Sequence, residues 1–142
     1  MTIYLLDTNH ASPLVTDGHP LRKRILRQLE AGDMFATCVP LLTELIFGIG
    51  ILPRAVANRA AWAQIQSLIP CYIPDETDAT LAAEMQIALR RQGQQLATID
   101  ALAAVIALRY NLVPLTTDKD FQAVPHLKLA NWLAKPLPED PQ

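Results

Sequence analysis

The amino-acid sequence predicts an α/β domain with a central, mainly parallel sheet of four to five strands between two layers of helices. The chain has 142 residues, of which 51% are hydrophobic and 18% charged, values typical of one globular domain. Short apolar runs alternate with segments of helical periodicity, which favours a parallel sheet covered on both faces. Several of the 11 prolines fall where an apolar run changes character, as expected at element boundaries.

The first half of the chain is predicted to alternate three strands with three helices. In the first helix Leu21, Ile25 and Leu29 share one face, and Gly32 follows its end. Pro40 suits the first position of the second helix, where its missing N–H costs nothing. The expected strands are 2–7, 34–39 and 71–73, and the expected helices are 19–30, 40–48 and 53–68.

The second half is predicted to contain two longer helices and two further strands. A helix over 77–91 is closed by Gly93, and a second helix runs from Thr98, its expected N-cap, to Tyr110. The strands are expected at 112–116 and 127–130. We expect one domain over residues 1–134 and a loose, proline-rich tail over residues 135–142.

Composition restricts the compartment and the partners. The net charge of -2 gives no overall basic surface for nucleic acid, so a polyanion would need local patches or metal ions. Residues 34–53 carry one charge and approach the length of a membrane span, but Pro40 and a central Glu44 argue against one. The N-terminus lacks the basic region of a signal peptide. We therefore expect a soluble, cytoplasmic protein with no membrane partner, in which Cys38 and Cys71 are buried structural thiols.

Four acidic residues are predicted to meet at one edge of the sheet. Asp7 ends the first strand, Glu44 lies about one turn into the helix after the second strand, Asp100 lies in the first turn of the Thr98 helix, and Asp118 follows strand 112–116. In an open α/β sheet, ligands bind beyond the carboxyl ends of the strands. The sequence thus predicts an acidic pocket, with no histidine or lysine placed as a base.

Each acid also has a purely structural interpretation. Asp7 can cap a helix, Asp100 is favoured at a helix start by the dipole, and Asp118 suits a turn. Glu44 is harder to explain, because a buried carboxylate without a partner is costly. A bound divalent cation would compensate it. Oxygen ligands without thiol or imidazole favour Mg²⁺ or Mn²⁺ over zinc, and such ions support phosphodiester hydrolysis.

These residues lie in motifs that resemble the PIN-domain ribonucleases, most closely the VapC toxins of VapBC toxin–antitoxin pairs. The resemblance covers about residues 3–132 and therefore implies a PIN-like, Rossmann-like three-layer fold. The motifs are LLDTN (5–9), TELIFGI (43–49), IDALAAVIA (99–107), LTTDKDF (115–121) and LANW (129–132).

The resemblance also implies an activity, a cofactor and partners. Asp7, Glu44, Asp100 and Asp118 match the catalytic, metal-binding acids of the family, which would hold one or two Mg²⁺ or Mn²⁺ ions for cleavage of RNA. Polar positions that would orient a carboxylate or a water are matched by Asn9, Thr116 and Asp120. A VapB-like antitoxin and a homodimer are the expected protein partners, with the antitoxin on an apolar groove formed by Leu45, Ile46, Phe47, Ile49, Ile51 and Leu52.

The sequence departs from the family pattern at two places. His10 stands where an aliphatic residue is usual, and we expect it at the surface at a helix start, with substrate contact as the alternative. The last motif, TTDKDF, favours Asp118 over Asp120 as the fourth acid.

Other interpretations remain open. A phospho-aspartyl protein would need a paired acid where Thr8 and Asn9 stand, and a non-catalytic PIN-like module for RNA or protein would be expected to lack one of the four acids. A solvated helix face is the default for the basic cluster, with RNA-backbone contact as its alternative; the cluster comprises Arg22, Lys23, Arg24 and Arg27.

Overall fold

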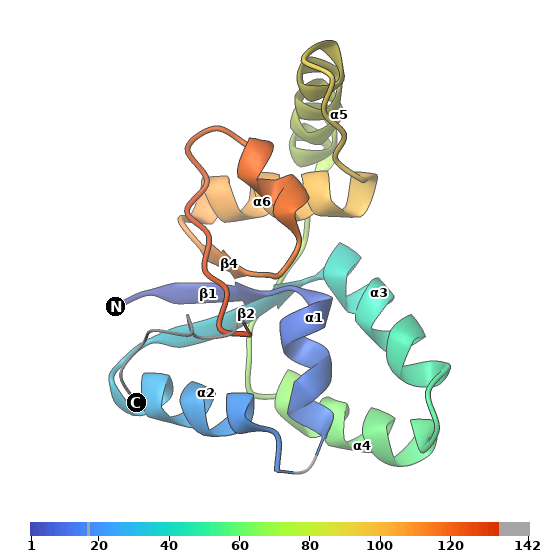
Figure 1. The fold of residues 1–142 in the computed structure, drawn as a ribbon, viewed down its shortest axis with the longest axis vertical. Helices are drawn as coiled ribbons and strands as arrows, with labels where there is room; N and C mark the ends of the chain where they lie inside the picture. The colour runs from blue at the N-terminus through green and yellow to red at the C-terminus, as the bar shows by residue number, and fades with distance from the viewer. Residues whose placement is uncertain (17, 134–142) are drawn as a thin grey trace, which may run out of the picture.

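A computed structural model of the chain, which describes residues 1–16 and 18–133, has a four-stranded parallel sheet at its centre (Figure 1). The strand order is β3-β2-β1-β4, with β1 at Ile3–Leu6, β2 at Met34–Cys38, β3 at Cys71–Tyr72 and β4 at Val113–Leu115. The predicted mainly parallel sheet is confirmed. The central strand β1 pairs with β2 on one side and with β4 on the other.

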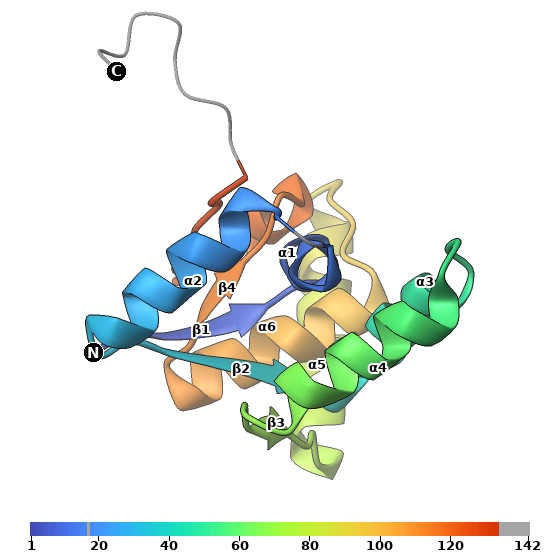
Figure 2. The same ribbon diagram turned by 90° about the horizontal axis from the view of Figure 1, so that it is seen from below.

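Within the described residues, six α-helices complete a three-layer α/β/α arrangement, as predicted. One face of the sheet is covered by α6, on which α5 packs, and the other by α2 and α4 (Figures 1 and 2). Short 3₁₀ helices that the sequence pattern did not predict occupy Ser12–Val15 (η1) and Lys119–Ala123 (η2). The α-helices are Thr8–Ala11 (α1), Pro20–Glu30 (α2), Val39–Gly50 (α3), Ala55–Gln66 (α4), Glu76–Arg91 (α5) and Thr98–Tyr110 (α6).

The strand β1 separates two hydrophobic cores because successive side chains point to opposite faces. Leu5 packs on the α6 side with Cys38 and Ile106. Leu6 packs on the other side with Leu21, Trp62 and other side chains of α2, α3 and α4. The two cores hold the sheet from both faces, and all its strands end at the same edge.

The predicted strand at 127–130 is wrong: only Ala130 forms a bridge, to Leu115. Its N–H donates to the Pro114 carbonyl at 3.0 Å, and its carbonyl accepts from the Thr116 N–H at 3.0 Å. His126 just before it has a left-handed φ of 67°, and Leu127 and Leu129 pack against the cores. This stretch follows the core surface and touches the sheet edge at one residue.

Two further predictions are corrected by the structure. Cys38 is buried, and burial raises the pKa of its thiol to about 11, but Cys71 is exposed because it lies on the short edge strand β3. Ala97, without a side-chain cap, precedes α6, and the Thr98 hydroxyl instead accepts a hydrogen bond from Gln86 Nε2 at 3.2 Å. The predicted tail at 135–142 lies outside the described residues.

In the part of the chain that the structure describes, no helix combines the length and the apolar character that crossing a membrane would require. The apolar stretch 34–53 is divided between β2 and α3.

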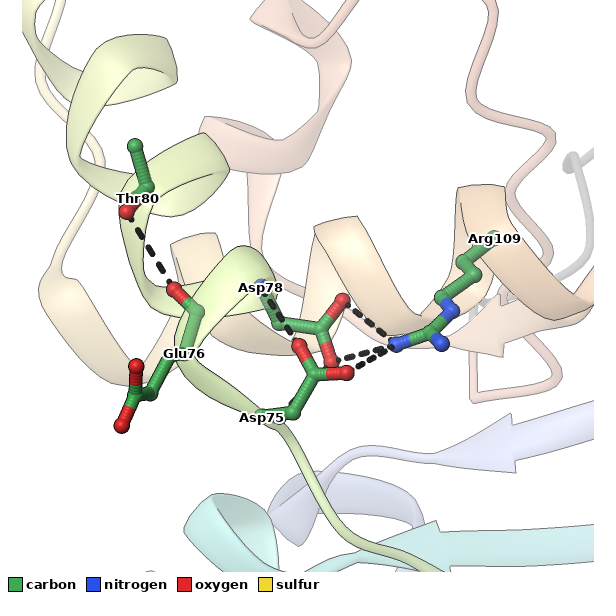
Figure 3. Close-up of polar contacts among 5 residues, drawn as sticks. All are labelled: Asp75, Glu76, Asp78, Thr80 and Arg109. Carbon is green, nitrogen blue, oxygen red and sulfur yellow. Dashed lines mark hydrogen bonds and ion pairs between the residues drawn. The ribbon is translucent and has the colours of Figure 1, made fainter.

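The helices α5 and α6 are joined by an ion pair between a buried aspartate and an exposed arginine (Figure 3). Asp78 is fully buried, and Arg109 Nη1 contacts its two carboxylate oxygens at 2.9 and 3.1 Å and Asp75 Oδ2 at 3.1 Å. Asp75 and Asp78 also form a capping box, in which each side chain accepts from the other's backbone N–H at 2.9 Å. These hydrogen bonds from the Asp78 N–H and from Arg109 lower the pKa of Asp75.

Replacing Asp78 should therefore loosen the α5–α6 layer. We expect Asp78→Ala to lower the free energy of unfolding by about 2–3 kcal/mol, since it removes one half of the capping box and the charge-assisted hydrogen bonds to Arg109. Glu76→Ala, in the same helical turn but with its carboxylate directed away from Arg109 (Figure 3), should change it by less than about 0.5 kcal/mol. Urea denaturation of both variants measures the difference, and equal effects would contradict a structural role for the pair.

Candidate functional site

Asp7 lies at the carboxyl end of the central strand and is almost completely buried, at 5% exposure. Its Oδ1 accepts the Thr8 N–H at 2.9 Å, as the N-cap of α1. Its Oδ2 accepts the Thr116 hydroxyl at 2.7 Å and the Asn9 side-chain amide at 3.2 Å. The orientation of the carboxylate is therefore set by three donors, two of them on the side chains that the sequence predicted to orient it.

Glu44 and Asp100 approach Asp7 from two different helices. Glu44 lies in the second turn of α3, which follows β2, and Asp100 lies in the first turn of α6. One carboxylate oxygen from each of the three residues lies within 4.8 Å of the other two. Three acids therefore meet at this edge of the sheet, although the first and the last of them are 93 positions apart in the sequence.

The proximity of these carboxylates changes their ionisation. Burial raises the pKa of Asp100 from 3.8 to about 7, and the carboxylates of Asp7, Asp118, Glu44 and Asp120 add to the shift in that order. Burial, followed by Asp7 and Asp118, also raises the pKa of Glu44. Within residues 1–16 and 18–133 no ion pair joins an arginine or lysine to Asp7, Glu44 or Asp100.

Glu44 is exposed rather than buried, contrary to the sequence-based expectation. The helix α3 turns Leu45 and Ile49 into the core and leaves Glu44 on its open side. Desolvation therefore acts more strongly on the half-buried Asp100 than on Glu44, which contributes its carboxylate to the cluster from an exposed position.

Asp118 lies beside the three-acid cluster but outside it. It is the N-cap of η2, where its Oδ1 accepts the Asp120 N–H at 2.9 Å, and its own N–H donates to Thr116 Oγ1 at 2.9 Å. Its charge raises the pKa of both Glu44 and Asp100, whereas Asp120 acts on Asp100 alone, as the smallest contribution. The charge of Asp118 therefore acts more strongly on the cluster than that of Asp120, whose backbone N–H donates to Asp118.

The donor set fits a hard divalent cation. Three carboxylates offer oxygen ligands from one buried, one half-buried and one exposed side chain. Mg²⁺ and Mn²⁺ prefer such ligands and retain water at the remaining positions. An ion between them would also relieve the repulsion that raises the pKa of Asp100.

The predicted surface position of His10 is wrong. It is completely buried, at 0% exposure, and contacts Asn9 through Nδ1 at 2.7 Å. No local signal predicts this burial, because α1 has only four residues and too little length for a periodic pattern.

The basic cluster on α2 is partly engaged within the protein. The Arg24 guanidinium lies 4.3 Å from the centre of the Trp132 ring. Lys119, by contrast, is exposed beside Asp118 and lines a polar pocket of ≈ 260 Å³ with Thr116, Gln122 and Asn131. Asp118 also belongs to the lining of this pocket.

Comparison with known proteins finds one matching protein family and several solved structures with a similar fold. The family model of the PIN domain matches residues 4–127. VapBC2 from Rickettsia felis, bound to a promoter DNA fragment, is 23% identical over 92% of this chain and 99% of that chain, with a TM-score of 0.79. DNA-bound VapBC from Salmonella typhimurium is 22% identical over 93% and 99% of the two chains, with a TM-score of 0.78.

A third solved structure, the sarcin–ricin loop cleaving toxin VapC20 from Mycobacterium tuberculosis, is 18% identical over 86% of this chain and 94% of that chain, with a TM-score of 0.63. At these identities the likeness establishes the fold. No curated protein sequence matches the chain.

The raised pKa of Asp100 predicts how the stability of the metal-free protein depends on pH. From about pH 4 to about pH 7 the folded protein keeps a proton that the unfolded chain releases, so the free energy of unfolding should fall as the pH rises through this window. Asp100→Asn should flatten this part of the profile, whereas Glu84→Gln, on the exposed side of α5, should leave it unchanged. Urea denaturation in EDTA at several pH values measures both slopes, and equal slopes for wild type and Asp100→Asn would contradict the prediction.

Proposed function

The chain belongs to the PIN domain family, and on that premise we propose that it is a metal-dependent endoribonuclease that acts in the cytoplasm as the toxin of a toxin–antitoxin pair. The single observation that carries the proposal is the meeting of Asp7, Glu44 and Asp100 within 4.8 Å, from three separate elements. The cleavage of an RNA loop by the similar toxin VapC20 supports RNA as the substrate.

The acids are proposed to hold Mg²⁺ or Mn²⁺, as one or two ions. Asp7, Glu44 and Asp100 supply carboxylate ligands, and Asp118 adds negative charge at the same edge. A bound ion would activate water and stabilise the charge that develops on the phosphate. Thr116 and Asn9 hold the carboxylate of Asp7 in one orientation, so that its free lone pairs remain directed at the site.

The position of the cluster suits a polyanionic substrate only when a cation is bound. A net charge of -2 and four adjacent acids repel RNA phosphates. Lys119, an exposed basic residue that follows Asp118 directly, lines the neighbouring polar pocket. We propose that it contacts the RNA backbone. The alternative function, a non-catalytic PIN-like interaction module, predicts RNA or protein binding without cleavage.

Substitution of Asp100 should separate function from stability. Asp100→Asn removes one of several repelling charges, so its melting temperature in EDTA should equal or exceed that of the wild type. It should gain less stability from added Mn²⁺ or Mg²⁺, because a ligand is lost and binding stabilises the native state by mass action. Cleavage of total RNA should be lost, a fall of at least about a hundredfold.

The matched control for this experiment is Glu84→Gln, which neutralises an exposed acid on α5 and should retain cleavage and metal response. A destabilised Asp100→Asn variant with full cleavage would show that Asp100 serves only the start of α6. Cleavage by the wild type that persists in excess EDTA would contradict the metal dependence.

A VapB-like antitoxin is the proposed protein partner, supported by the VapBC assemblies among the similar structures. Of the apolar residues predicted for its groove, Leu45 and Ile49 belong to the core, whereas Phe47 and Ile51 are 68% and 69% exposed. Beside them a pocket of ≈ 340 Å³ is lined by Glu44, Gly48 and Leu52, among others. We propose that an antitoxin segment covers this face of α3 and reaches the acids from it.

A homodimer is also part of the proposal. Apolar side chains remain exposed on the opposite layer, where Leu81 of α5 is 46% and Leu108 of α6 is 41% exposed. Both line a groove between the two helices, together with Met85 and Val105. A second copy of the chain would cover this surface without blocking the acids.

A matched pair of isoleucine substitutions tests the antitoxin surface. Ile51 and Ile73 are 69% and 73% exposed, but only Ile51 adjoins α3, as the residue that caps its C-terminal end. With the product of the reading frame directly upstream as partner, Ile51→Ser should weaken binding by about tenfold, as the loss of an apolar anchor does. Ile73→Ser should bind like wild type, and both variants should cleave RNA. Calorimetric titration measures the affinities, and equal affinities would move the interface elsewhere.

A further inference from the structure

The buried side chain of His10 has two hydrogen-bond partners, and together they determine its tautomer. The Trp132 backbone N–H points at His10 Nε2 at 3.0 Å, and the Asn9 Oδ1 lies 2.7 Å from His10 Nδ1. An N–H can only donate and a carbonyl oxygen can only accept, so Nε2 is the acceptor and Nδ1 carries the hydrogen. Burial, and then the charge of Arg24, lower the pKa of His10 to about 4, in keeping with a neutral ring.

The orientation of the Asn9 amide is set by three contacts. Its Oδ1 accepts from His10 Nδ1 and from the Thr117 N–H at 3.2 Å, and its Nδ2 donates to Asp7 Oδ2 at 3.2 Å. A continuous chain of hydrogen bonds therefore runs from the Trp132 backbone N–H through the side chains of His10 and Asn9 to the carboxylate of Asp7. The two ends of this chain of hydrogen bonds are separated by 125 positions in the sequence.

We infer that His10 is a positioning residue that holds Asn9, and through Asn9 the Asp7 carboxylate, in the orientation that a divalent cation requires. This inference rests on the proposed function. His10 is not one of the three residues whose carboxylate oxygens meet at the cluster. Groups that hydrogen-bond directly to a metal ligand typically contribute ten- to a hundredfold to metal affinity. Asn9 makes such a bond to Asp7, and His10 acts on it through Asn9.

A competing role for His10 is purely structural. Trp132 packs on Tyr4 with ring centroids 4.8 Å apart, and its ring lies under Arg24. The bond from the Trp132 N–H to His10 therefore anchors the C-terminal segment to the core. The two ring nitrogens of His10 therefore have different roles. Nδ1 donates to Asn9 beside the acids, and Nε2 accepts the bond that anchors Trp132.

Two substitutions separate these contributions. The amide nitrogen of asparagine can occupy the place of Nδ1, so His10→Asn can keep the donation to Asn9 and lose the acceptor for Trp132. The amide oxygen of glutamine can occupy the place of Nε2, so His10→Gln keeps the acceptor for Trp132 and loses the donation to Asn9. Both changes place a neutral amide at the same buried position.

The readout is the dissociation constant for Mn²⁺ alone, measured by calorimetry on the full chain, beside the melting temperature in EDTA. His10→Gln should bind Mn²⁺ about ten- to a hundredfold more weakly while its melting temperature falls less than that of His10→Asn. His10→Asn should bind Mn²⁺ within a few-fold of wild type. Asn9→Ala should match the loss in His10→Gln, and the double variant Asn9→Ala/His10→Gln should lose no more, because the two residues act in series.

Other outcomes would overturn the inference in distinguishable ways. If wild type and His10→Gln bind Mn²⁺ equally, His10 is only an anchor, and the proposed function stands. If the wild type binds no Mn²⁺, both the inference and the proposed function fail. Should neither variant fold, ¹⁵N chemical shifts of the His10 ring in the wild-type protein still decide: hydrogen on Nδ1 supports the chain of hydrogen bonds, and hydrogen on Nε2 contradicts it.

Discussion

The repulsion between carboxylates at one edge of the sheet is the constraint on which the site depends. Asp100 lies in the first turn of a helix, where the dipole favours a negative charge, and yet burial and neighbouring acids raise its pKa to about 7. Such an arrangement persists only if other parts of the fold oppose the repulsion. The two hydrophobic cores on either side of β1 supply that free energy. The backbone N–H of Asp7 also bonds the Leu115 carbonyl at 3.1 Å, so Asp7 cannot leave without disrupting the pairing of β1 with β4.

The parallel topology explains why acids from distant segments meet. With β1 at the centre of the order β3-β2-β1-β4, the end of β1 faces the starts of the segments that follow β2 and β4. Asp7 therefore meets Glu44 from the helix after β2 and Thr116 from the turn after β4. The C-terminal segment joins the same assembly through the bridge at Ala130 and the bond from Trp132 to His10. The site and the closing segment are one hydrogen-bonded unit.

The charge of the site and the apolar surface beside it would both control access of a substrate to the acids. An acidic pocket repels an RNA backbone until a cation is bound, so the metal would control substrate binding as well as chemistry. The exposed apolar face of α3, with Phe47 and Ile51, adjoins Glu44. A partner that covers this face would lie over the acids, and inhibition would follow from the position of the interface. The ion pair of Asp78 with Arg109, which joins α5 to α6 (Figure 3), lies at the end of α6 opposite to Asp100.

The sequence by itself determined the features that depend on local pattern. Apolar runs, helical periodicity and turn residues predicted the four strands of the sheet, the long helices and the placement of Asp7 at a strand end, because these depend on neighbours within a few positions. Burial depends on contacts with distant segments, and only the tertiary structure decided it. Glu44 is exposed because α3 turns its other face to the core. His10 is buried because its ring accepts a hydrogen bond from Trp132, 122 positions away, and no pattern within a four-residue helix carries that information.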